Sequence, residues 1–65
     1  MMTNNVDTQE SGKRELILEG ALKVFSQKGF HGATVEEVAE VAGVGKGTVY
    51  LYFGSKTDLF VSVVE

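Results

Sequence analysis

Residues 34–53 read TVEEVAEVAGVGKGTVYLYF, and this stretch decides the fold. It opens with a capping box, because Thr34 can accept the backbone N–H of Glu37 while the Glu37 carboxylate reaches back to the backbone of Thr34. Gly43 can take the positive φ that ends a short helix. Gly45 can then cap a further helix that runs through Phe53 and stops at Gly54. We therefore expect two short helices joined by a turn of about three or four residues.

The side chains between these two helices fit a close crossing. Ala39 lies shortly before Gly43, at a place where a small residue is needed because the helices approach tightly. The apolar residues that can fill the wedge between them are Val38, Ala42, Val44 and Val49. Two short helices with such a turn form the helix-turn-helix unit, whose second helix reads the major groove of DNA. The same geometry also fits a small three-helix core without a DNA partner.

A longer helix is expected before this unit, over residues 13–28. Its buried stripe follows the helical period and consists of Ile17, Ala21, Val24 and Phe25. Gly29 supplies a left-handed cap, after which Phe30 can fold back onto Phe25. Gly20 inside the helix costs roughly 1 kcal/mol relative to Ala. We therefore expect a neighbouring helix to approach Gly20 closely.

A fourth helix should start at the SKTD motif of residues 55–58, which is similar to a second capping box. Its apolar side carries Leu59, Phe60, Val63 and Val64, and this pattern is still running at the last residue, as in a fragment. The expected fold class is all-α: a three-helix, homeodomain-like helix-turn-helix bundle over residues 13–65, with the start of a fourth helix. Residues 1–12 are polar and are expected to form a disordered tail.

Composition limits the functions open to this domain. The chain has 65 residues, no cysteine and one histidine, so neither a disulfide nor a metal site is expected. No catalytic residues are expected either, because no set of acids, bases and a cleft can be assembled. The net charge of −3 counts against a nucleic-acid partner. However, residues 41–57 hold two lysines, Lys46 and Lys56, and no acid, so the local charge permits a DNA-binding face.

The expected third helix has an outward face suited to DNA. At 100° per residue its core-facing positions are Val49, Phe53 and part of Tyr52. The opposite face carries Gly47 and Leu51, flanked by Thr48 and Tyr50. Hydroxyl groups can form hydrogen bonds with base edges, and Leu51 can touch a thymine methyl group.

Residues 17–60 resemble the TetR family of bacterial regulators. The matching segments are ILEGALKVFSQKGF, TVEEVAEVAGV and KGTVYLYFGSKTDLF, and YxYFxSK after AGV is specific to that family. The resemblance implies an N-terminal DNA-binding domain. In the full-length protein, a helical domain that dimerises and binds a small effector would follow. That second domain is expected to lie outside this chain.

The resemblance also implies a role for each matching residue. The recognition-helix residues that mix phosphate and base contacts are Lys46, Gly47, Thr48 and Tyr50. Leu51 occupies a variable position at which operator choice is tuned, and Tyr52 a position that contacts phosphate. Lys56 matches the lysine that begins the fourth helix and contacts the DNA backbone. Thr34 matches the N-cap of the second helix, which can also touch a phosphate.

Three residues depart from the family pattern. Gly45 replaces the usual Ser at the N-cap of the recognition helix, so a side-chain cap and a possible hydroxyl contact to phosphate are lost. Glu36 lies early in the second helix, where a basic residue would aid the approach to DNA. Gly20 replaces a common Ala and lowers helix stability.

Sequence-specific binding of duplex DNA is therefore the expected function, as the operator-reading domain of a TetR-like regulator that is a repressor by family default. The alternative is a small helical protein-interaction module without DNA affinity, which the net charge favours. The implied partners are a palindromic operator, a second copy of the full-length protein, and an effector bound by its other domain. This fragment alone is expected to be a monomer. No cofactor and no membrane partner are expected, and the expected compartment is the cytoplasm.

Overall fold

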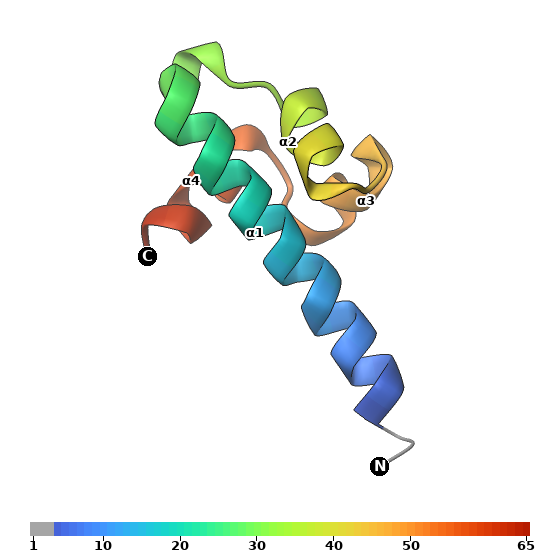
Figure 1. Cartoon of the computed structure of the whole chain (residues 1–65). Helices are drawn as coiled ribbons and strands as arrows, with labels where there is room; N and C mark the ends of the chain where they lie inside the picture. Colours follow the sequence, from blue (N-terminus) through green and yellow to red (C-terminus); the bar gives the residue numbers. More distant parts are fainter. Residues whose placement is uncertain (1–3) are drawn as a thin grey trace.

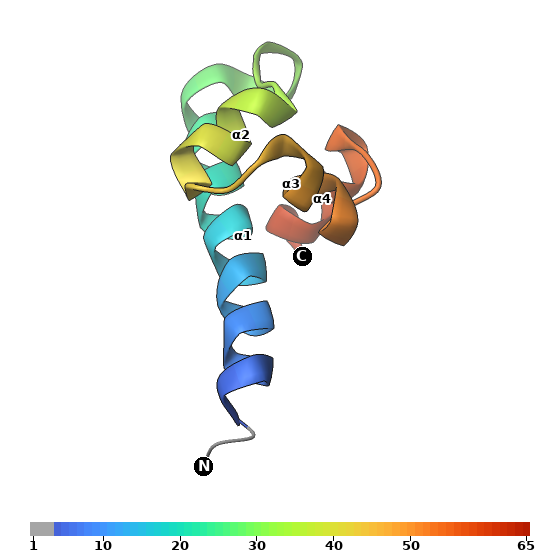
Figure 2. The same cartoon turned by 90° about the vertical axis from the view of Figure 1, so that its right-hand side faces the viewer.

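The computed structural model describes the backbone of residues 4–65 and the side chains of residues 12–65, and this part of the chain is all-α (Figure 1). Its helices are α1 (Asn4–Gly32), α2 (Val35–Ala42), α3 (Lys46–Tyr52) and α4 (Lys56–Val64). Both α2 and α4 pack against α1, and α3 packs against α2. The first turns of α1 extend away from this bundle (Figure 2). The expected helix-turn-helix bundle with a fourth helix is confirmed.

The first helix begins earlier than the sequence predicts. It begins at Asn4 rather than near Lys13. The intervening residues contain no proline, so no residue in that stretch removes a helical N–H donor. Residues 1–3 and the side chains of residues 4–11 lie outside the described part of the structure. The disordered tail expected over residues 1–12 therefore stays a prediction.

The end of α1 is shaped by Gly29, whose φ of 74° and ψ of 173° break the regular helix. The positive φ expected at this glycine is present, but its ψ lies outside the left-handed helical region. One further turn then reaches Gly32, and it is closed by the N–H of Ala33, which donates to the Gly29 carbonyl over 3.1 Å. The helix therefore ends later than the predicted residue, Lys28.

One apolar core joins all four helices. Its buried members are Ile17, Ala21, Val24, Phe25, Ala33, Val35, Val38, Ala39, Ala42, Val49, Phe53 and Leu59. The predicted stripe on α1 and the small residue at the crossing, Ala39, are therefore confirmed. Three of the four predicted wedge residues are buried, and the fourth, Val44, is half-buried against them. Removing this apolar surface from water is the main stabilising term for so small a domain.

The two helices α1 and α2 cross at Gly20. A Cβ placed there would lie 3.2 Å from the carbonyl oxygen of Val38 and 3.2 Å from the amide nitrogen of Ala42. Both atoms belong to the backbone of α2, which cannot turn aside as a flexible side chain can. The close approach predicted from the sequence is confirmed, and it gives Gly20 a packing role.

An aromatic cluster fastens α4 to the end of α1. The ring of Phe25 stacks on that of Phe30 at a centroid distance of 6.2 Å, as predicted. Phe60 of α4 meets both rings edge to face, at 5.2 Å from each. Such arrangements match the charge distribution of aromatic rings and add to the effect of burial. The cluster therefore holds α4 against α1 near the connection to α2.

The third helix ends one residue earlier than predicted. Phe53 has extended backbone angles, φ −136° and ψ 122°, and its ring enters the core, so the last helical residue is Tyr52. The guanidinium of Arg14 lies over the Phe53 ring, 5.4 Å from its centroid. Helix α4 then starts behind Ser55, whose hydroxyl accepts the backbone N–H of Asp58 over 3.1 Å. The predicted cap of α4 is therefore present.

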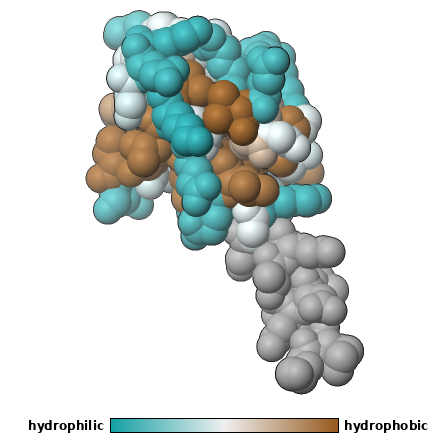
Figure 3. All heavy atoms as spheres, viewed as in Figure 1, coloured by the Kyte–Doolittle hydropathy of each residue, from teal (hydrophilic) through white to brown (hydrophobic). Residues whose placement is uncertain are grey.

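Hydrophobic side chains also reach the surface. Those that are large and exposed are Leu16, Leu22, Val41, Tyr50, Leu51, Val61 and Val64. On the face drawn in Figure 3, hydrophobic areas lie on both sides of a hydrophilic band. Isolated apolar residues are ordinary on protein surfaces. Tyr50 and Leu51 differ from the others because both lie on α3, the predicted recognition helix.

Candidate nucleic-acid interface

The turn between α2 and α3 places the predicted recognition helix. Gly43 has the left-handed conformation, with φ 77° and ψ 28°, as predicted. Its N–H donates to the carbonyl of Glu40, and the N–H of Val44 donates over 3.0 Å to the carbonyl of Ala39. Gly45 follows in an extended conformation. Its carbonyl oxygen accepts hydrogen bonds from the backbone N–H groups of Thr48 and Val49 in α3. These bonds make a short, closed turn, so α3 has a defined direction relative to α2.

The side chains of α3 divide into an inner and an outer face, as predicted. Val49 is buried, and Tyr52 is half-buried against the core. Leu51 is 83% exposed and Tyr50 is 45% exposed. Gly47 is exposed between them on the same side of the helix, and Thr48 is half-buried at its edge. The outer face therefore presents one phenol, one aliphatic side chain and a stretch of bare backbone.

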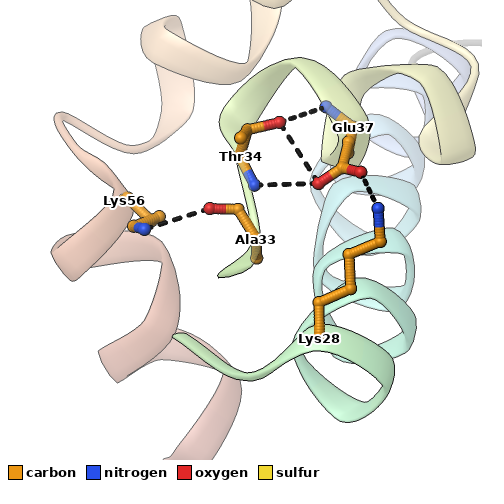
Figure 4. Close-up of polar contacts among 5 residues, drawn as sticks. All are labelled: Lys28, Ala33, Thr34, Glu37 and Lys56. Carbon is orange, nitrogen blue, oxygen red and sulfur yellow. Dashed lines mark hydrogen bonds and ion pairs between the residues drawn. The ribbon is translucent and has the colours of Figure 1, made fainter. Parts of the chain in front are cut away.

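The N-cap of α2 is a complete capping box (Figure 4). The Thr34 hydroxyl oxygen accepts the N–H of Glu37 over 3.1 Å, and the N–H of Thr34 donates to the Glu37 carboxylate over 3.1 Å. Lys28 of α1 forms an ion pair with the same carboxylate. This ion pair, and secondarily the Thr34 N–H, hold the pKa of Glu37 below its usual value. The capping role predicted for Thr34 is confirmed, and its contact with phosphate stays a prediction.

Lys56 has internal partners that the sequence did not predict. Its Nζ donates to the carbonyl oxygen of Phe30 over 2.7 Å. It also donates to the carbonyl oxygen of Ala33 over 3.0 Å (Figure 4). The same ammonium lies 4.4 Å from the centroid of the Phe30 ring, within the range of a cation–π contact. Lys56 therefore joins the start of α4 to the connection between α1 and α2. The two carbonyls take two of the three donors of the ammonium, and the contact of Lys56 with a phosphate stays a prediction.

Lys46, the first residue of α3, also has a partner within the protein. Its Nζ lies 2.8 Å from Oε2 of Glu36, in the first turn of α2. The hydrogen bond and the charge of Lys46 hold the pKa of Glu36 below its usual value, and the same contact raises the pKa of Lys46. Sequence reasoning noted Glu36 as a departure from a basic pattern but did not connect it with Lys46. The two residues lie 10 positions apart and share no local pattern, so no sequence signal pointed to this pair.

The predicted site residues fall into two groups. Those carried by α3 share one short helix: Lys46, Gly47, Thr48, Tyr50, Leu51 and Tyr52. The other two, Thr34 and Lys56, flank Ala33, because Thr34 follows it in the chain and Lys56 binds its carbonyl. Along the chain, Thr34 precedes α2 and Lys56 follows α3. Such a layout can reach base edges through α3 and the DNA backbone through the flanking residues.

Metal binding and membrane insertion are two further properties of the described part of the chain. No group of three or more His, Cys, Asp or Glu side chains there is placed to hold a metal ion. No helix in that part is both long enough and apolar enough to span a bilayer.

Comparison with known proteins identifies the family. Residues 17–63 match the family model described as bacterial regulatory proteins, tetR family. The chain is 48% identical over 55 residues to the HTH-type transcriptional regulator RutR of Escherichia coli (strain K12). It is 44% identical over 57 residues to the HTH-type transcriptional repressor NicS of Pseudomonas putida. These matches cover 85% and 88% of this chain but 26% and 27% of the relatives, so the chain spans about a quarter of their length.

Solved structures agree with this match. The crystal structure of a HlyIIR mutant protein superposes with a TM-score of 0.82 and 31% identity, over 83% of this chain and 30% of that one. The fatty acid degradation regulator FadR from Bacillus halodurans superposes with a TM-score of 0.76 and 41% identity, over 78% of this chain and 27% of that one. Together with the family match, these similarities show that the chain is a helix-turn-helix domain and belongs to the TetR family of bacterial regulatory proteins.

Proposed function

We propose that this domain reads an operator in duplex DNA by placing the outer face of α3 in the major groove. The observation that carries the proposal is the division of α3, in which Val49 is buried while Leu51 and Tyr50 face solvent. A helix that only completed a core would have no need of two large exposed side chains beside bare backbone. In the groove, Leu51 would contact a thymine methyl group, and Tyr50 and Thr48 would form hydrogen bonds with bases or phosphates.

Phosphate contacts are proposed for the polar groups around this face. Lys46 and Tyr52 lie at the two ends of α3, and Lys56 and Thr34 lie beside Ala33. Contacts of this kind fix the position of the protein on DNA without reading its sequence. The relative named as a repressor, NicS, supports the same role for the protein to which this domain belongs.

The relatives also support proposals about the whole protein. Because they are about three times as long as this chain, we propose that a further domain pairs two copies on a palindromic operator and binds a small effector. Helix-turn-helix proteins commonly bind two half-sites in this way. The proposed place of action is the cytoplasm, where a bacterial chromosome is accessible.

Selection from a random DNA pool tests the proposal. The chain is fused to a dimerising helix, bound duplexes are recovered over several rounds, and their sequences are compared. A shared palindromic motif is the expected result. Recovery of no motif, together with no gel shift of genomic DNA at low salt, would favour the alternative of a protein-interaction module. The net charge of −3 is the observation behind that alternative.

A further inference from the structure

The ion pair between Lys46 and Glu36 lies at the start of the proposed recognition helix. Lys46 is the first residue of α3, and Glu36 is the second residue of α2. Their charged atoms are 2.8 Å apart, and their side chains are 52% and 63% exposed. The pair therefore lies at the surface, where an approaching phosphate would meet both charges together.

We propose that Glu36 restrains sequence-independent binding to DNA by competing with phosphate for Lys46. This inference rests on the proposed function. A lysine bound to a carboxylate carries little net positive charge toward a distant phosphate. A phosphate that reaches Lys46 must either displace the carboxylate or tolerate its repulsion at close range. Affinity for any DNA is then lower, while the contacts of Leu51 and Tyr50 with bases are untouched.

The consequence is weaker binding to unrelated DNA sequences. Phosphate contacts supply nearly all of the affinity for unrelated sequences, whereas base contacts add to it only at the right site. The second cation of residues 41–57, Lys56, is also engaged, with the carbonyls of Phe30 and Ala33. The free domain therefore meets DNA with both lysines of this stretch already bound within the protein.

The test compares Glu36→Gln with a matched control, Glu40→Gln. Both residues are exposed on α2, and both substitutions raise the net charge by the same amount. Affinity for a labelled duplex of scrambled sequence is measured by fluorescence anisotropy between about 0.05 and 0.2 M salt. The same two substitutions are then made in a Lys46→Gln background. Circular dichroism confirms that each variant is folded at the temperature of the assay.

Glu36→Gln is expected to bind the scrambled duplex up to about tenfold more tightly than Glu40→Gln at the lowest salt, with a salt slope steeper by about 1. The difference should vanish in the Lys46→Gln background, because there is then no ammonium that loss of the Glu36 charge could free for phosphate. Equal affinities of the two variants, or a difference that persists without Lys46, would overturn the inference about Glu36. The proposed function would stand in that case, because the domain would still bind DNA. Failure of the unaltered chain and all variants to bind any duplex would overturn the proposed function and this inference together.

Discussion

The Nζ of Lys56 lies 3.0 Å from the carbonyl oxygen of Ala33, so the first residue of α4 binds the residue directly before the N-cap of α2. The same ammonium binds the carbonyl of Phe30, within the last turn of α1. One side chain therefore ties together three helices at the point where α2 begins. Because α2 directs α3 through a closed turn, this contact helps to set the orientation of the proposed recognition helix.

Lys56→Met should lower both stability and DNA affinity. The substitution keeps an unbranched side chain but removes two charge-assisted hydrogen bonds, and the expected loss is roughly 1–3 kcal/mol in the free energy of unfolding. Urea denaturation followed by circular dichroism measures this loss. If the remaining donor also holds a phosphate, all DNA sequences should be bound more weakly and the salt slope should fall by about 1. A stable variant with a changed site preference would contradict both roles.

Leu51→Ala should alter operator choice without altering the fold. The Leu51 side chain is 83% exposed, so its truncation creates no cavity. If Leu51 contacts a thymine methyl group, discrimination at one base position should fall by about 1–3 kcal/mol. Site selection with the dimerised domain measures this discrimination. Val41→Ala, an exposed apolar residue on α2, is the matched control and should leave the selected motif unchanged; the same motif from both variants would refute the role of Leu51.

Acid should weaken the N-cap of α2. The pKa of Glu37 is lowered in the folded domain by the ion pair with Lys28 and by the Thr34 N–H, relative to a usual value of 4.5. A lowered pKa stabilises the fold above the unfolded-state pKa, and this stabilisation is lost as the pH falls through the folded-state pKa. The melting temperature, measured by circular dichroism from neutral to acid pH, should fall less steeply below that usual value in Glu37→Gln than in the unaltered chain. Parallel curves for the two proteins would contradict the linkage.

The crossing at Gly20 predicts unequal effects for two glycine substitutions in α1. Gly12→Ala meets no atom within 4 Å, so the better helix propensity of alanine should stabilise the domain by up to about 1 kcal/mol. Gly20→Ala gains the same propensity but presses its Cβ against the backbone of α2 at 3.2 Å. Its unfolding free energy, measured with urea, should lie at least about 1 kcal/mol below that of Gly12→Ala. Equal unfolding free energies for Gly12→Ala and Gly20→Ala would show that α2 can move away from the added Cβ without loss of stability.

The local features of this fold could be predicted from the sequence, because each depends on neighbouring residues. The capping box at Thr34, the turn at Gly43 and the exposure of Leu51 follow from caps and helical period. The partners of the two lysines could not be predicted in this way. The bond from Lys56 to Ala33 spans 23 positions and the bond from Lys46 to Glu36 spans 10, and neither has a local pattern. Long side chains find such partners only once the helices are packed.

The last prediction concerns the number of copies that bind DNA. One chain offers one α3, which is seven residues long, and the lysine on that helix is already paired with Glu36. The affinity of the free domain for one half-site should therefore lie in the range of non-specific binding, roughly 10⁻⁴–10⁻⁶ M at physiological salt. Two recognition helices in one assembly, about 34–36 Å apart, would match adjacent turns of the major groove.

Joining two copies should therefore raise the affinity strongly, because the second contact becomes intramolecular. A gain of about 10²–10⁴ is expected when the linker lets both helices reach a palindromic site. Sedimentation of the free chain gives its oligomeric state, and fluorescence anisotropy with and without a dimerising fusion gives the gain. A linked pair in which one copy carries Leu51→Ala is the control and should lose discrimination in only one half-site. A free chain that is already a stable dimer, or that binds a single half-site at nanomolar concentration, would show that the pairing surface lies within these 65 residues.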